Sequence, residues 1–120
     1  MGRSSTVSNV VVEKFNRLRA YLALCRRYCE RGVQCRGDRY SIRYIAIGIH
    51  RLLQELSSLG TVLRLDSMEC EKALELLHDI GEAMMVAKYS EYTDEQIMHT
   101  LCTVCPCIDI AIAEKLKQFH

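Results

Sequence analysis

The feature that most constrains the fold is an apolar stripe near the N-terminus. Its residues are spaced three or four apart: Val11, Phe15, Leu18, Leu22, Cys25 and Cys29. Each residue advances by about 100° around an α-helix, so this spacing places all six side chains on one face. The stripe predicts a long helix that starts near Ser8 or Asn9 and ends at Arg31, where Gly32 supplies a stop signal.

A second apolar set, Tyr21, Leu24 and Tyr28, flanks this stripe. The two sets together cover about half of the helix surface, which exceeds the roughly 100° that a one-sided surface helix needs. A central bundle helix with two buried flanks would explain this width, and so would a surface for self-association. We predict self-association, with Tyr21, Leu24 and Tyr28 as the contact of a homodimer or larger homo-oligomer.

The next segment, from Tyr40 to Leu59, has two interpretations. Isoleucines at every second position between residues 45 and 49 follow the period of a β-strand. Apolar residues at helical spacing continue well beyond them, however, and the segment ends in good helix formers before Gly60. Its length and this stop signal favour a second helix.

Two further helices are predicted from capping signals. Asp66 and Glu69 resemble a capping box at the start of a third helix, which fades near residues 88–91. Thr93 and Gln96 form a clearer capping box for a fourth helix. Its apolar stripe keeps register across Pro106, so we expect one kinked helix there and not two separate ones.

The length of 120 residues fits a single domain that can bury a core without crosslinks. We therefore predict an all-α fold, an antiparallel bundle of about four helices with the last one kinked at Pro106. Residues 1–7 are small and polar and are expected to form a flexible N-terminus, and residues 8–120 the helical domain.

The net charge of +1 conceals a strong asymmetry. Residues 1–51 contain eleven Lys and Arg against three Asp and Glu, a net charge of +8. Residues 52–120 contain five against twelve, a net charge of −7. Such a split is typical of a basic half that binds nucleic acid or a membrane surface, but it also arises when basic helices pack beside acidic ones.

Almost every cation in the basic half is arginine, whose planar guanidinium binds phosphate through two parallel hydrogen bonds. Interleaved tyrosines would allow stacking on exposed bases. We predict a small regulatory protein that binds RNA or other nucleic acid through this face. The predicted contacts are Arg19, Arg26, Arg27, Arg31, Arg36, Arg39 and Arg43. The alternative is a protein–protein adaptor that docks on partners through its basic and acidic halves.

The seven cysteines are expected to be reduced thiols, because no secretory signal is visible. His99, Cys102, Cys105 and Cys107 could ligate zinc, but a single helix cannot surround a tetrahedral ion and a second ligand pair would have to come from elsewhere in the chain. We predict no bound metal and no cofactor. The sequence contains no phosphate-binding loop or hydrolase motif, so we predict a protein that is not an enzyme.

The sequence has no run of 18 consecutive apolar residues, so we predict no transmembrane segment. The expected location is intracellular, in the cytoplasm or nucleus. Gly2 and Thr6 match the loose pattern for N-terminal myristoylation, although Arg3 beside the acceptor glycine counts against it.

Overall fold

The computed structural model describes residues 2–31, 39–86 and 91–119, and these residues form helices joined by short connectors. The elements are α1 (Gly2–Arg31), α2 (Arg39–Ser58), α3 (Met68–Val86), α4 (Asp94–Leu116) and a terminal 3-10 turn, η1 (Lys117–Phe119). The prediction of an all-α bundle of four helices is confirmed.

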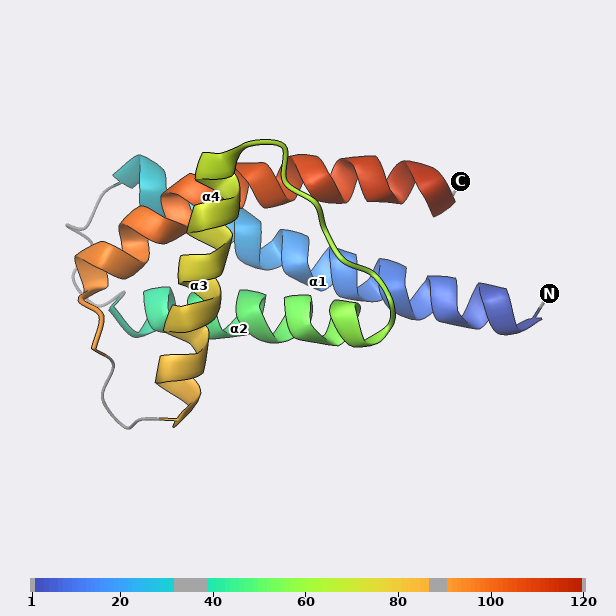
Figure 1. Cartoon of the computed structure of the whole chain (residues 1–120), viewed down its shortest axis with the longest axis horizontal. Coiled ribbons are helices and arrows are strands. Elements are labelled where there is room, and N and C mark those ends of the chain that lie inside the picture. Colours follow the sequence, from blue (N-terminus) through green and yellow to red (C-terminus); the bar gives the residue numbers. More distant parts are fainter. Residues whose placement is uncertain (1, 32–38, 87–90, 120) are drawn as a thin grey trace.

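Three helices follow the long axis of the molecule, and α3 crosses them (Figure 1). α1 runs antiparallel to α2 and to α4 and packs against both. α3 connects α2 to α4 in the chain and packs on both. It crosses the bundle instead of running back along it, so α2 and α4 run in the same direction (Figure 1). α1 and α3 therefore cover different sides of the α2–α4 pair.

The core forms where the stripe of α1 meets α2 and α4. Phe15 and Leu18 are fully buried, and they belong to the same core as Ile49 of α2 and Ile108 of α4. Burying one such side chain stabilises the fold by about 1.5–3 kcal/mol. The wide apolar arc of α1 therefore has an internal explanation, because the helix has a neighbour on each flank.

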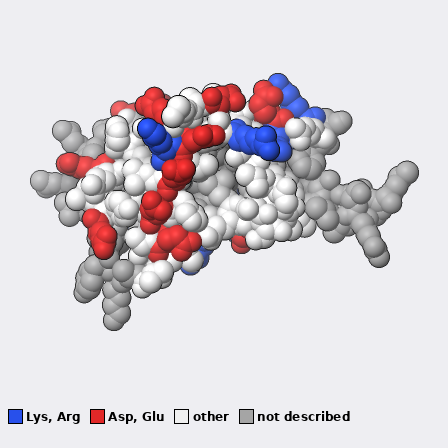
Figure 2. Space-filling model, in the orientation of Figure 1, with Lys and Arg blue, Asp and Glu red and all other residues white. Residues whose placement is uncertain are grey.

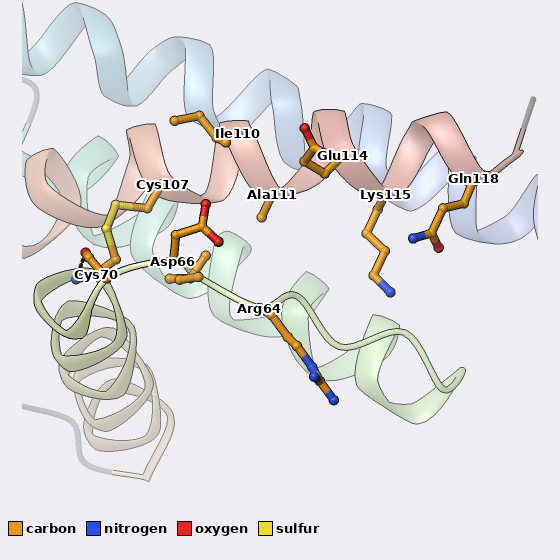
Figure 3. Close-up of a pocket in the computed structure, with 11 residues that line it drawn as sticks. Arg64, Asp66, Cys70, Cys107, Ile110, Ala111, Glu114, Lys115 and Gln118 are labelled. Carbon is orange, nitrogen blue, oxygen red and sulfur yellow. Dashed lines mark hydrogen bonds between the residues drawn. A yellow bond between two sulfur atoms is a disulfide. The ribbon is translucent and has the colours of Figure 1, made fainter.

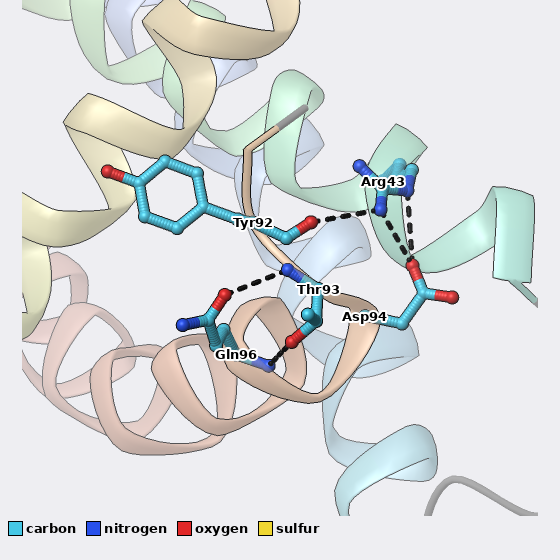
Figure 4. Close-up of polar contacts among 5 residues, drawn as sticks. All are labelled: Arg43, Tyr92, Thr93, Asp94 and Gln96. Carbon is cyan, nitrogen blue, oxygen red and sulfur yellow. Dashed lines mark hydrogen bonds and ion pairs between the residues drawn. The ribbon is translucent and has the colours of Figure 1, made fainter. Parts of the chain in front are cut away.

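The structure confirms one predicted helix start and corrects another. At α4 the Thr93 backbone N–H donates to Gln96 Oε1 at 2.8 Å, and the Gln96 N–H donates to Thr93 Oγ1 at 3.1 Å (Figure 4). At α3 the cap is Ser67 and not Asp66, because the Cys70 N–H donates to Ser67 Oγ at 3.1 Å. A serine at the cap position satisfies a free N–H of the first turn.

The helix boundaries agree with the sequence pattern except at the N-terminus. α1 begins at Gly2 instead of Ser8 or Asn9, because no proline interrupts the polar residues in between. α2 is helical throughout, so the alternative of a strand is wrong. It ends before Gly60, whose φ of 81° makes the turn that leads into the connector to α3.

α4 stays one helix through Pro106, as predicted, and its two halves slope differently in Figure 1. By length and composition, it could cross a membrane: an 18-residue window reaches a mean hydropathy of 1.4. Half of that window is buried inside the bundle, as is expected of a core helix. The absence of a transmembrane segment stays a prediction.

Candidate functional site in the α1–α2 groove

Part of the charge asymmetry is neutralised inside the fold. Among the described residues, three Lys or Arg ion pairs join the basic half to the acidic half: Lys14 Nζ to Glu55 Oε2 at 3.2 Å, Arg26 Nη2 to Asp109 Oδ2 at 2.8 Å, and Arg43 Nη2 to Asp94 Oδ1 at 3.1 Å. Packing basic helices beside acidic ones was the internal explanation of the charge split, and it accounts for these three cations.

Arg43 is held most firmly of the three. Its Nε and Nη2 both lie 3.1 Å from Asp94 Oδ1, and Nη2 also donates to the Tyr92 carbonyl oxygen at 3.1 Å (Figure 4). Both ionic side chains are about one-third exposed or less. This guanidinium therefore fastens α2 to the start of α4, beside the capping box of Thr93.

The other arginines of the predicted RNA site have different surroundings. Arg19 and Arg27 are exposed, and no carboxylate of the described residues pairs with them. Arg26 points toward α4, where it pairs with Asp109. Arg36 lies outside the described residues, as do the side chains of Arg31 and Arg39. The described contacts do not join these arginines into one site.

A different set of residues forms a groove between α1 and α2, with a volume of about 400 Å³. We call it the α1–α2 groove: Arg17, Tyr21, Tyr44, Ile47, Gly48, Arg51, Leu52 and Glu55. The Tyr21 and Tyr44 ring centroids lie 5.7 Å apart in a tilted arrangement. Tyr21 is half-buried and Tyr44 is 64% exposed, so the second ring is presented to solvent.

Gly48 lets the two helices approach closely in this groove. A Cβ built on Gly48 would lie 2.4 Å from Tyr21 Cζ, which is closer than side chains pack. The Tyr21 ring therefore lies directly on the backbone of α2. The groove owes its shape to this contact, because the ring fills the space that a side chain at position 48 would occupy.

The surroundings of Tyr21 shift its pKa in opposite directions. A hydrogen bond with Tyr44, together with burial, raises the pKa of Tyr21 above its usual value. The positive charges of Arg17 and Arg51 oppose this pKa shift, which places both guanidinium groups near the phenol. Among the described residues no carboxylate pairs with either arginine, so two positive charges are free to meet an anion.

The sequence pattern alone did not single out Arg17 or Arg51 for the RNA site. It favoured arginines opposite the apolar arc, whereas Arg17 lies at the edge of that arc, on the side facing α2. A usable signal was present, since Arg17 and Tyr21 are four apart and Tyr44, Gly48 and Arg51 also share a helical face. The pairing of these two faces required the tertiary structure.

The residues predicted for self-association follow the same side of α1. Tyr21 lies in the groove, and Tyr28 is half-buried against the core. Leu24 is 42% exposed. Much of this flank is therefore occupied by the fold itself, and self-association through it stays a prediction.

The expectation that all cysteines are reduced thiols is wrong for four of them. Disulfides join Cys29 of α1 to Cys102 of α4, and Cys70 of α3 to Cys107 of α4. Sequence spacing could not reveal these pairs, because the partners are 73 and 37 residues apart and meet only where the helices pack. The predicted intracellular location stays a prediction.

These disulfides divide the cluster that could have ligated zinc. Cys102 and Cys107 are oxidised, Cys105 is a buried free thiol, and His99 is exposed. A hydrogen bond with Cys25, together with burial, raises the pKa of Cys105 well above its usual value, so this thiol stays protonated. Cys25 Sγ also lies 3.9 Å from Cys29 Sγ. Four sulfurs thus gather between α1 and α4, with two of them bonded together.

A second pocket lies beside the Cys70–Cys107 disulfide, between α4 and the connector to α3 (Figure 3). Its charged residues are Arg64, Asp66, Glu114 and Lys115, two of each sign. Such a mixed lining favours neither an anion nor a cation, so we assign no ligand to it.

Comparison of the chain with protein-family models, with curated proteins and with solved structures gave no match. Function is therefore inferred from the surfaces of the molecule itself.

Proposed function

We propose that this chain binds single-stranded RNA, or nucleic acid of similar shape, through the α1–α2 groove. Arg17 and Arg51 would contact phosphates, and Tyr44 would stack on a base. The observation that carries this proposal is the presence of two unpaired guanidinium groups beside an exposed tyrosine ring. Proteins that bind single strands combine the same two elements, cations for the backbone and aromatic rings for the bases.

The exposed arginines outside the groove have a lesser part in this proposal. Arg19 and Arg27 would add electrostatic attraction from outside the groove, because they are not among its lining residues. Arg26 and Arg43 are already paired with carboxylates and would contribute less. The function proposed is regulatory binding and not catalysis.

A second candidate function is a protein–protein adaptor, and the surface of α3 favours it. This helix carries Glu69, Glu71, Glu75, Asp79 and Glu82 against a single lysine, Lys72. Figure 2 shows acidic side chains in a stripe over α3, on the face where that helix crosses the bundle. A basic partner protein would be attracted to this stripe, whereas RNA would be repelled from it.

The experiment is a salt-titrated gel shift with single-stranded and double-stranded RNA. The test variant is Arg17→Gln/Arg51→Gln, and the matched control is Arg19→Gln/Arg27→Gln, which removes the same charge from outside the groove. All four are exposed, so each double change should alter the free energy of unfolding by no more than about 0.5 kcal/mol per residue. A third variant, Tyr44→Ala, removes the exposed ring.

We expect the groove variant to weaken binding of single strands and to flatten the plot of log affinity against log salt. The slope should fall by about 0.7 for each phosphate that the variant no longer neutralises. Tyr44→Ala should cost about 1–3 kcal/mol of binding free energy, the usual contribution of one stacked base. The control should have a smaller effect. The RNA proposal fails if the parent protein binds no RNA at low salt, and the adaptor then takes its place.

Self-association is measured separately by light scattering on the same samples. A homodimer that dissociates on Leu24→Gln would support the predicted contact, because Leu24 is the exposed member of that set. A parent protein that is monomeric at high micromolar concentration would remove self-association from the proposal.

A further inference from the structure

His50 is a buried polar side chain at the contact between α2 and α3. It is only 2% exposed, and its Nε2 makes no well-aligned hydrogen bond among the described residues; the nearest acceptor is Glu82 Oε1, 3.4 Å away. Burying a ring nitrogen without a partner is unfavourable, because the hydrogen bond it made to water is lost. A buried nitrogen without a well-aligned hydrogen bond is available to an ion or a water molecule.

Two further donor atoms lie beside this nitrogen. Glu82 Oε1 is 3.4 Å from His50 Nε2 and 4.0 Å from His78 Nε2, and the two imidazole centroids are 4.8 Å apart. His78 and Glu82 are one turn apart on α3, so they share a face of that helix. The three donor atoms all lie within 4.8 Å of one another.

Neighbouring residues hold two members of this cluster, His50 and Glu82, in position. A Cβ on Gly81 would lie 2.4 Å from His50 Cγ, so the imidazole rests on the bare backbone of α3. Gln54 Nε2 donates to Glu82 Oε1 at 2.9 Å and orients the carboxylate. Metal sites in proteins commonly have such outer hydrogen bonds, which fix the position of their ligands.

We propose that His50, His78 and Glu82 bind one divalent transition-metal ion of the zinc type. Two imidazoles and one carboxylate are a donor set that suits zinc, whereas Mg²⁺ and Ca²⁺ prefer oxygen ligands alone. The remaining coordination position would open to the groove between α2, α3 and their connector, which both histidines line. The ion would join α2 to α3 at a point where no disulfide of the described residues does so.

The distances between the three donor atoms are close to those of a tetrahedral zinc site. Zinc ligands lie about 2.0–2.2 Å from the metal, so tetrahedral donors are separated by about 3.3 Å. The His50–Glu82 separation of 3.4 Å already matches this value. The side chains of His78 and Glu82 are 56% and 46% exposed, so His78 is free to rotate toward the other two donors.

The experiment titrates ZnCl₂ into the full, disulfide-bonded chain by calorimetry and records the absorption spectrum with Co²⁺ in place of zinc. The test variants are His78→Ala, at an exposed position of α3, and Glu82→Gln, at a partly exposed position of α3. The matched control is His99→Ala, because His99 is an exposed histidine on α4 outside the cluster. Melting of each variant without metal shows whether it is folded.

We expect one zinc ion per chain, and at least tenfold weaker binding in either test variant but not in the control. The cobalt spectrum should show a nitrogen and oxygen environment without sulfur-to-cobalt charge transfer. Zinc should also raise the melting temperature of the parent and not of the test variants, because the ion binds only the folded arrangement.

Three results would overturn the proposal: no stoichiometric zinc binding by the parent, undiminished binding in the double variant His78→Ala/Glu82→Gln, or a sulfur signature in the cobalt spectrum. The last would place the metal at the free thiols between α1 and α4 instead. RNA binding is tested on other residues, so either proposal can fail while the other stands.

Discussion

The two contacts that α2 makes with α1 and α3 use the same device in different surroundings. In each, a ring lies on a glycine of the neighbouring helix: Tyr21 of α1 on Gly48, and His50 of α2 on Gly81. The Tyr21 ring is half-buried and borders an open groove, whereas the His50 ring is fully buried. The same close approach therefore borders an open groove at α1 and, at α3, places a buried ring beside the partly exposed side chains of His78 and Glu82.

The difference lies in which atoms touch the glycine. At Gly48 the nearest atoms are Cζ, Cε1 and Oη, at the far end of a tyrosine that can swing outward. At Gly81 they are Cγ, Cδ2 and Cβ, near the root of the histidine, and the Cβ can move only if α2 moves. Burial also lowers the pKa of His50, with the neighbouring His78 adding to the effect, so the ring is neutral at pH 7. The contact of Tyr21 with Gly48 can therefore adjust by side-chain rotation, whereas the contact of His50 with Gly81 cannot.

The largest expected effect comes from the crosslinks that support both contacts. Cys29–Cys102 holds α1 to α4, and Cys70–Cys107 holds α3 to α4. We expect Cys70→Ser/Cys107→Ser to lower the free energy of unfolding by about 2–4 kcal/mol, because the unfolded chain gains freedom when the loop is opened. Urea denaturation of the variant and the parent measures the difference.

Thiol titration of the denatured parent is the control for this experiment. It should reveal four fewer thiols than the seven cysteines of the sequence. A full complement of thiols, or a loss of stability below about 1 kcal/mol in the double variant, would show that α3 is held by its contact with α2 and not by the crosslink.

The next effect is that of Gly81→Ala in the presence of a chelator. We expect it to lower the free energy of unfolding by about 2 kcal/mol, because overpacking against a ring that cannot move outweighs the better helix propensity of alanine. Urea denaturation measures it. A neutral or stabilising result would mean that His50 can leave its buried position.

Gly48→Ala should have a much smaller effect. We expect the free energy of unfolding to stay within about 0.5 kcal/mol of the parent, because Tyr21 can rotate outward while alanine improves the helix. The same urea measurement applies. A loss equal to that of Gly81→Ala would remove the distinction between the two contacts.

The smallest effect concerns the titration of Tyr21. Its pKa is raised, chiefly by the hydrogen bond with Tyr44, so the folded state favours the neutral phenol. This contribution to stability is complete below about pH 10, the usual pKa of tyrosine, and is lost as the pH rises through the higher pKa of the folded state. We expect Tyr44→Phe to return the pKa of Tyr21 toward its usual value in an ultraviolet titration. An unchanged curve would show that the hydrogen bond is not formed in solution.

The sequence by itself determined the helices. The stripe from Val11 to Cys29, the Thr93–Gln96 capping box and the continuity through Pro106 all appear in the structure, because helix spacing and caps depend on residues a few positions apart. Five of the six residues of that stripe are buried, and the sixth, Cys29, forms a disulfide.

Only the tertiary structure decided which helices meet, and with them every candidate site. Arg17 and Arg51 share a groove, and His50 joins His78 and Glu82, although nothing in the local sequence links Arg17 to Arg51 or His50 to α3. The sequence pattern of a helix shows which of its side chains are buried but not which neighbouring helix covers them. The choice of neighbour depends on close packing across the whole core, where Gly48 and Gly81 admit the rings of Tyr21 and His50.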